Sequence, residues 1–167
     1  AGTKKGRLVI WQWNCRSFLN NKATMAQHIK TTAKRKKPDV IILQETFDHA
    51  KIAGQFWRGH KQRPCKQPQP QATHKQRTKG TGRDIVVTTL VKKGLVAIPR
   101  IMRKITDVSH ILIEVVPRSK RESSTFVLNV YSSPSKKGLT QNFEDLFNET
   151  MTIAGDNRLI IGGDFNA

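Results

Sequence analysis

Short apolar runs, separated by polar turns that often contain glycine, dominate the hydrophobic pattern of the chain. The run at 40–43 is apolar on both faces, which is typical of a strand buried between two layers. Further strands are predicted at 8–13, 85–91, 111–116, 125–130 and 159–161. Strands interleaved with helical segments indicate the α/β class of folds.

Two segments between these strands, 22–37 and 141–154, carry apolar residues at helical spacing. Pro38 ends the first helix, which links two predicted strands. Such a crossover places the strands on either side of it parallel. Asn14 and Glu45, which follow those two strands, are therefore expected at the same end of one sheet.

Antiparallel pairing is predicted elsewhere. The turn at 92–94 is expected to lead into a hairpin in which 95–98 continues from the strand at 85–91. The strands at 111–116 and 125–130 are joined by a charged connection and are predicted to pair antiparallel.

Residues 49–83 have an unusual composition, with nine Lys or Arg, three Pro and neither Asp nor Glu. This composition predicts a long basic loop or a poorly ordered insertion. Phe56 and Trp57 near its start are interpreted as an anchor to the core, although aromatic side chains can also stack on bases.

The net charge of +18, from 30 Lys or Arg against 12 Asp or Glu, favours a polyanionic partner, most simply nucleic acid. A membrane surface, an acidic protein or a merely solvated basic surface are the alternatives. Cys15 and Cys65 are too few for a disulfide framework, and no secretory or membrane-spanning segment is visible. We therefore expect an intracellular protein, neither secreted nor membrane-bound, and a nuclear one if DNA is the partner.

Polar side chains follow four of the predicted strands. They are Asn14, Glu45, Tyr131 and the pair Asp164 and Asn166, which comes directly after two glycines. An ordinary turn would also explain the last pair. Carboxylate and amide oxygens suit Mg²⁺ or Mn²⁺, and such an ion can polarise a phosphoryl oxygen. Together with the basic surface, this pattern predicts a phosphodiester substrate.

Four segments carry a resemblance to a known family: 10–17, 38–46, 128–134 and 163–167. They resemble successive motifs of the endonuclease/exonuclease/phosphatase superfamily, above all of its branch in non-LTR (LINE-type) retrotransposons. There an endonuclease domain precedes a reverse transcriptase domain in the same polypeptide. The resemblance implies a deoxyribonuclease I-like fold, a two-layer mixed β-sandwich flanked by helices (α/β, or α+β), and a Mg²⁺- or Mn²⁺-dependent endonuclease that nicks DNA for retrotransposon insertion.

The resemblance also implies roles for single residues. Glu45 would be the main metal ligand, and Asn14 would assist at the metal and phosphate. Tyr131 would contact the scissile phosphate. Asp164 would be a further metal residue and would orient the attacking water or help manage protons. Asn166 would steady the transition state. The basic residues expected to contact DNA are Arg16, Lys92 and Lys93.

The family also carries a further Asp and an Asp-His pair downstream of the motif at 163–167, and this chain stops before them. Residues 1–167 are therefore expected to form a single partial domain, with the basic loop or insertion at about 49–83, that is inactive or nearly so and prone to aggregate. A non-catalytic, basic nucleic-acid-binding remnant is one alternative. A phosphatase of the same superfamily that acts on small phosphoesters is another, and the charge of +18 disfavours it.

Overall fold

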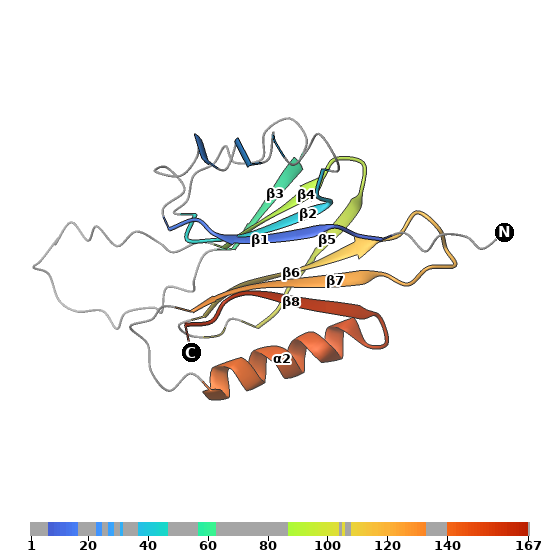
Figure 1. The fold of residues 1–167 in the computed structure, drawn as a ribbon. Coiled ribbons are helices and arrows are strands. Elements are labelled where there is room, and N and C mark those ends of the chain that lie inside the picture. Colours follow the sequence, from blue (N-terminus) through green and yellow to red (C-terminus); the bar gives the residue numbers. More distant parts are fainter. Residues whose placement is uncertain are drawn as a thin grey trace, which may run out of the picture.

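Two four-stranded sheets packed face to face form the molecule (Figure 1). The computed structural model describes residues 7–16, 23–24, 27–28, 31, 37–46, 57–62, 87–103, 105, 108–132 and 140–166, with the backbone alone for 57–62. The predicted two-layer sandwich with mixed sheets is confirmed. No helix in these ranges is long and apolar enough to cross a membrane.

The first sheet has the strand order β1-β2-β4-β3. Its strands are β1 (Ile10–Asn14), β2 (Val40–Gln44), β3 (Trp57–Gln62) and β4 (Val87–Lys92). The parallel pairing predicted for β1 and β2 is confirmed, while β4 runs antiparallel to both β2 and β3.

The second sheet has the order β5-β6-β7-β8. Its strands are β5 (Val96–Arg100), β6 (Val108–Val116), β7 (Thr125–Ser132) and β8 (Arg158–Asp164). The antiparallel pairing of β6 with β7 is confirmed. Helix α2 (Thr140–Ala154) connects β7 to β8, which pair in parallel. Each sheet thus contributes one parallel pair to the sandwich.

Two expectations about the strands are corrected. The hairpin of 95–98 with the strand at 85–91 is wrong, because β5 pairs with β6 and the turn before it carries the chain from one sheet to the other. The stretch 49–83 is not loop throughout, since β3 pairs with β4 along its whole length. The sequence of this strand has no apolar alternation that would predict it. Phe56 and the rest of that stretch lie outside the described residues.

The predicted helix at 22–37 is described at five positions, 23, 24, 27, 28 and 31, and all of them are helical. The Thr31 hydroxyl donates to the backbone oxygens of Gln27 and His28, at 2.8 and 3.1 Å. The ring of His28 lies edge-on to Trp13, with 5.7 Å between centroids. This contact places the helical residues against the outer face of the first sheet.

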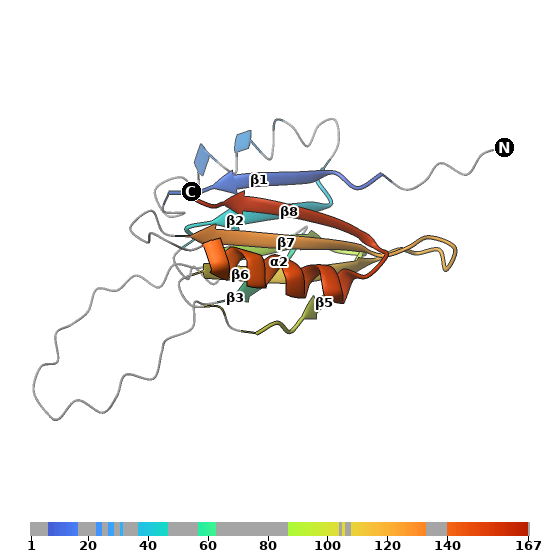
Figure 2. The same ribbon diagram turned by 90° about the horizontal axis from the view of Figure 1, so that it is seen from below.

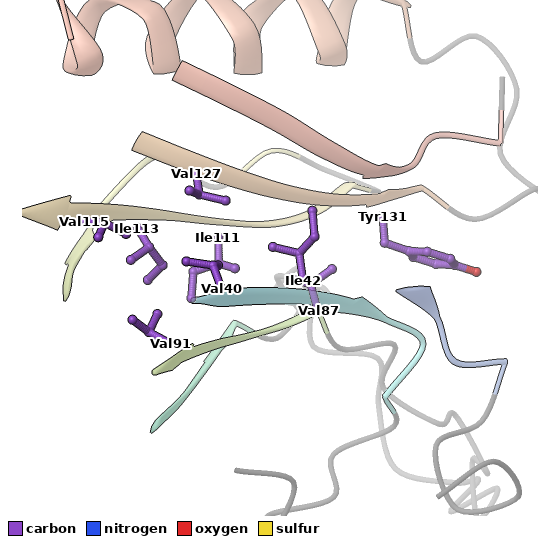
Figure 3. Close-up of a cluster of buried hydrophobic side chains, with 9 residues drawn as sticks. All are labelled: Val40, Ile42, Val87, Val91, Ile111, Ile113, Val115, Val127 and Tyr131. Carbon is purple, nitrogen blue, oxygen red and sulfur yellow. The ribbon is translucent and has the colours of Figure 1, made fainter. Parts of the chain in front are cut away.

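The core lies between the two sheets, where β-branched side chains from both inner faces interdigitate (Figure 3). Tyr131 closes this cluster at one end, with its hydroxyl pointing away from the apolar side chains. A second cluster fills the space between the second sheet and α2, centred on Leu146 and Leu128. Gly155 ends the helix, with φ +56° and its N–H donating to the Met151 oxygen.

Candidate functional site

Four strand ends meet at one rim of the sandwich. Because β1 and β2 are parallel, Asn14 lies beside Gln44, one residue before Glu45. Because β7 and β8 are parallel, Tyr131 lies beside Asp164. Strands β1 and β8 belong to different sheets but lie next to each other (Figure 2). The chain topology therefore brings both pairs to one place.

Asn14 joins the two carboxylates of this rim. Its Nδ2 donates to Asp164 Oδ2 at 2.5 Å and to Glu45 Oε1 at 3.2 Å. Its Oδ1 accepts a hydrogen bond from the backbone N–H of Arg16 at 2.9 Å. The side-chain nitrogen of Asn14 therefore faces the two carboxylates, whereas a metal ligand would turn its side-chain oxygen toward them. In this orientation the amide supplies a donor to each of the two neighbouring carboxylates.

Tyr131 lies at the same place, with 5% of its surface exposed. Burial, a hydrogen bond from the phenol to Glu45 and the charges of Glu45 and Asp164 all raise the pKa of Tyr131. The phenol is therefore neutral at pH 7 and acts as a hydrogen-bond donor toward the centre of the site.

Asn166 lies at the edge of this cluster. Its Nδ2 donates to the backbone oxygen of Ser132 at 2.6 Å, and its backbone N–H donates to Asp164 Oδ1 at 3.3 Å. These bonds tie the end of β8 to the end of β7. The structure therefore brings Asn14, Glu45, Tyr131, Asp164 and Asn166 together.

The backbone around the site is strained. Within the described ranges, the non-glycine residues with positive φ are Arg16 (43°), Glu45 (56°) and Asn166 (45°). Each directly follows a strand end at the rim or lies two residues beyond one. A conformation of this kind costs about 1–3 kcal/mol and is typically retained where function requires it.

The two glycines before Asp164 permit close approach. A Cβ on Gly163, which has φ +153°, would lie 2.0 Å from the backbone oxygen of Val130. A Cβ on Gly162 would lie 2.5 Å from Ile42 Cδ1, across the gap between the sheets. The glycines let β8 approach both β7 and β2, which brings Asp164 within reach of Asn14.

The basic residues predicted to contact DNA are divided between the two ends of the sheets. Arg16 is exposed beside Asn14. Lys92 and Lys93 lie at the opposite end, because β4 runs antiparallel to β2 and ends where β2 begins. There the Lys92 ammonium lies 3.9 Å from the Asp39 carboxylate. The structure therefore does not bring these two lysines to the carboxylates.

The donor set at the rim fits a small divalent cation. Among the described residues no group of three or more His, Cys, Asp or Glu could hold a metal. Mg²⁺, however, commonly takes only one or two carboxylates and completes its shell with water and phosphate oxygens. Glu45 and Asp164 both reach one nitrogen atom of Asn14, so they lie close enough to share an ion. These two carboxylates are the ligands that the geometry supports.

Neither histidine side chain that the structure describes reaches the rim. His28 packs on Trp13 at the outer face of the first sheet, and His110 is buried on the helix side of the second. Cys15 lies near the site, but burial and then the charge of Glu45 raise the pKa of its thiol to about 12. The thiol therefore stays protonated and is a poor nucleophile.

Sequence reasoning missed Gln12, Gln44 and Asn129, which form hydrogen bonds directly behind the rim residues. The signal available was a carboxamide inside each of three apolar strands.

Comparisons with known proteins show the family and the fold of the chain. The model of the endonuclease/exonuclease/phosphatase family matches residues 11–167. The crystal structure of the AP endonuclease LMAP from Leishmania major is similar in fold, with a TM-score of 0.52 and 16% identity. The match covers 93% of this chain and 54% of that enzyme, so the chain spans about half of its length. No curated protein matches the sequence.

Proposed function

Because the chain belongs to the endonuclease/exonuclease/phosphatase family, we propose that it is part of a metal-dependent phosphodiesterase that nicks DNA. One observation carries the proposal. Asn14 and Asp164, separated by 150 positions, meet Glu45 in one hydrogen-bonded cluster. Bringing two carboxylates together around one amide costs electrostatic energy, which favours a functional role for this cluster over a purely structural one.

Glu45 and Asp164 would hold Mg²⁺ or Mn²⁺. When bound, the ion would polarise a phosphoryl oxygen and offset the charge of the leaving group. Asn14 holds the two carboxylates together and, after rotation of its amide, can present its oxygen to the ion or its nitrogen to the phosphate. Asp164 accepts a proton from the attacking water and orients it.

Two further residues would act on the phosphate. Tyr131 is a neutral phenol at pH 7, so it donates a hydrogen bond to a phosphate oxygen without repelling it. Asn166 lies beside Asp164 and would steady the charge that develops in the transition state. Both residues sit next to the carboxylates and need no large movement to act.

DNA is the proposed substrate. The charge of +18 favours a polyanion, and the neighbouring structure is that of an AP endonuclease. Arg16 is exposed at the rim, where it would contact a phosphate close to the scissile bond. Lys92 and Lys93 would contact DNA only where it passes the opposite end of the sandwich.

The biological role proposed for this nicking activity is insertion of a retrotransposon into DNA. Four motifs support this role, because their residues resemble those of the LINE-type branch of the family. They lie at 10–17, 38–46, 128–134 and 163–167. The proposal implies a reverse transcriptase domain in the same polypeptide and action in the nucleus. The same resemblance implies that residues 1–167 alone nick DNA weakly or not at all.

A second candidate function is DNA binding without catalysis. The observation that favours it is that neither described histidine side chain lies near the carboxylates. The resemblance implies that nucleases of this family carry an Asp-His pair downstream of the motif at 163–167. The two candidates share the metal and DNA sites and differ only in whether the bond is cut.

The test measures Mn²⁺ binding, DNA binding and nicking of a supercoiled plasmid by the same preparations. Glu45→Gln and Asp164→Asn should each weaken Mn²⁺ binding at least tenfold, whereas Glu122→Gln, at the opposite end, should not change it. DNA binding should persist in all variants and weaken steeply with salt. Mn²⁺ binding that survives both carboxylate substitutions would overturn the proposal. Metal-dependent nicking that both variants abolish would show an active endonuclease, and its absence would favour the non-catalytic candidate.

A further inference from the structure

Asn129 of β7 is a fully buried carboxamide that crosses the gap between the sheets. Its Nδ2 lies 3.2 Å from the backbone oxygen of Leu43, 3.1 Å from that of Thr88 and 3.3 Å from Thr89 Oγ1. These acceptors belong to β2 and β4 of the opposite sheet. One side chain of the second sheet therefore contacts the two inner strands of the first.

Two further carboxamides continue this contact. Gln44 of β2 is fully buried, and its Nε2 donates to Asn129 Oδ1 at 2.8 Å. Gln12 of β1 donates from Nε2 to Gln44 Oε1 at 2.7 Å. We call Gln12, Gln44 and Asn129 the carboxamide relay. It connects β1, β2 and β7 through directional bonds.

Each member of the relay lies one or two positions before a residue of the rim. Gln12 lies two positions before Asn14, and Asn129 lies two positions before Tyr131, so each pair shares one face of its strand. Gln44 is the residue immediately before Glu45. The relay thus forms the layer between the apolar core and the cluster of Asn14, Glu45 and Tyr131.

Apolar contacts between two sheets have no directional preference, so small slides cost little as long as the surface stays buried. Buried hydrogen bonds are different, because a shift leaves donors and acceptors unpaired. Each side-chain nitrogen and oxygen of Asn129 and Gln44 has a hydrogen-bond partner among the described residues. The buried bonds of Asn129 and Gln44 therefore fix one relative position of β2, β4 and β7. The bond from Gln12, an exposed residue, joins β1 to them.

We propose that the carboxamide relay is the positioning device of the site, which sets Asn14, Glu45 and Tyr131 at the separations that one metal ion and one phosphate require. Gln12, Gln44 and Asn129 are positioning residues, since none of them touches the substrate. The role in metal binding rests on the proposed function, whereas the role in setting the geometry of Asn14 does not.

The test compares Asn129→Leu with Leu146→Ala. The first variant removes the centre of the relay and keeps a similar volume. The second destabilises the buried cluster beneath α2 without touching the relay. A merely structural role of Asn129 would lower the melting temperature as Leu146→Ala does and leave the site unchanged in the folded molecules. The exchange Gln44→Asn with Asn129→Gln restores a carboxamide pair and should recover part of the loss.

Two readouts are recorded well below the melting temperature. The first is the NMR resonance of the Asn14 side-chain NH₂ group in metal-free buffer, which reports its bonds to Glu45 and Asp164. It should move in Asn129→Leu and stay in Leu146→Ala. The second is Mn²⁺ affinity, which should fall at least tenfold in Asn129→Leu and less than twofold in Leu146→Ala.

An Asn14 resonance that does not move in Asn129→Leu overturns the inference. If the wild-type chain binds no Mn²⁺, the proposed function fails, and the Asn14 resonance still decides the question of positioning. If Asn129→Leu does not fold, Gln12→Leu at the outer end of the relay takes its place. It must move the Asn14 resonance while the fold persists, and an unmoved resonance there overturns the inference as well.

Discussion

The side-chain nitrogen of Asn14 lies 2.5 Å from a carboxylate oxygen of Asp164, 150 positions later in the chain. The two residues end β1 and β8, which belong to different sheets. The same nitrogen also donates to Glu45. One amide therefore links both sheets of the sandwich and both carboxylates of the site.

Asn14→Ala should leave Glu45 and Asp164 close together without their shared donor. We expect the free energy of unfolding in metal-free buffer to fall by about 1–3 kcal/mol, because two partly buried bonds are lost and like charges face each other. Mg²⁺ should restore more stability to this variant than it adds to wild type. Urea titrations with EDTA and with Mg²⁺ measure both effects.

Asn157→Ala is the matched control for that experiment. It removes one side-chain bond, to the Ala154 oxygen at 2.8 Å, far from the carboxylates. Its stability should fall without any additional response to Mg²⁺. An equal response to Mg²⁺ in the two variants would contradict a shared cation site.

Tyr131, the one tyrosine of the chain, should make the fold sensitive to alkali. Its pKa is raised in the folded state by burial, by the bond to Glu45 and by the two carboxylates. The folded state therefore binds more protons than the unfolded state above about pH 10, the ordinary pKa of the phenol. The stability that the phenol contributes is present below that pH and is lost as the pH rises toward the folded pKa.

Tyr131→Phe should remove this part of the pH dependence, so that stability falls less between about pH 10 and 11 than in wild type. Cys15, whose pKa burial raises to about 12, keeps its own alkaline effect in both proteins. Thermal unfolding across this range measures the difference. Identical slopes in the two proteins would show that Tyr131 is not held against Glu45.

His110 should make the fold sensitive to acid. The side chain is 1% exposed, its Nε2 has no hydrogen-bond partner among the described residues, and burial lowers its pKa. The unfolded state binds more protons below about pH 6.5, so stability falls as the pH drops through that value. His110→Leu should flatten this slope, whereas His28→Leu, at an exposed position, should retain it. Urea midpoints between pH 5 and 7 test the difference.

Gly163→Ala should destabilise the fold by about 3 kcal/mol or more, because a Cβ would meet the Val130 backbone, which cannot easily move. Gly155→Ala is the control, since φ is +56° there and nothing lies within 4 Å of the added carbon. Its cost should be about 1 kcal/mol, from backbone conformation alone. Equal losses in the two variants would contradict the close approach of β7 and β8.

The sequence allowed much of this architecture to be predicted, for identifiable reasons. The strands of the core are continuous apolar runs, and a helical crossover makes β1 and β2 parallel. Asn14 and Glu45 could therefore be placed at one end of a sheet. The meeting with Tyr131 and Asp164 followed only from the family resemblance, because nothing in the apolar pattern says how two sheets face each other.

The predictions of strand partners failed where the pattern of apolar and polar residues does not determine which strands pair. The turn at 92–94 suits a hairpin and a crossing between sheets equally well, so the partner of β5 could not be read from it. Strand β3 has no apolar alternation and is recognised by backbone bonds alone. Lys92 and Lys93 remain predicted DNA contacts because of their charge, but charge does not reveal the direction in which β4 runs, which places them away from the carboxylates.

The bond between Asn14 and Asp164 has a consequence for the order of events during folding. Each sheet can form from its own half of the chain, but the rim arises only after the halves dock. Contacts between positions so distant in sequence close large loops and are expected late. Affinity for divalent ions would then appear only in the final step to the native state. A kinetic intermediate in which one sheet has formed would not bind Mg²⁺.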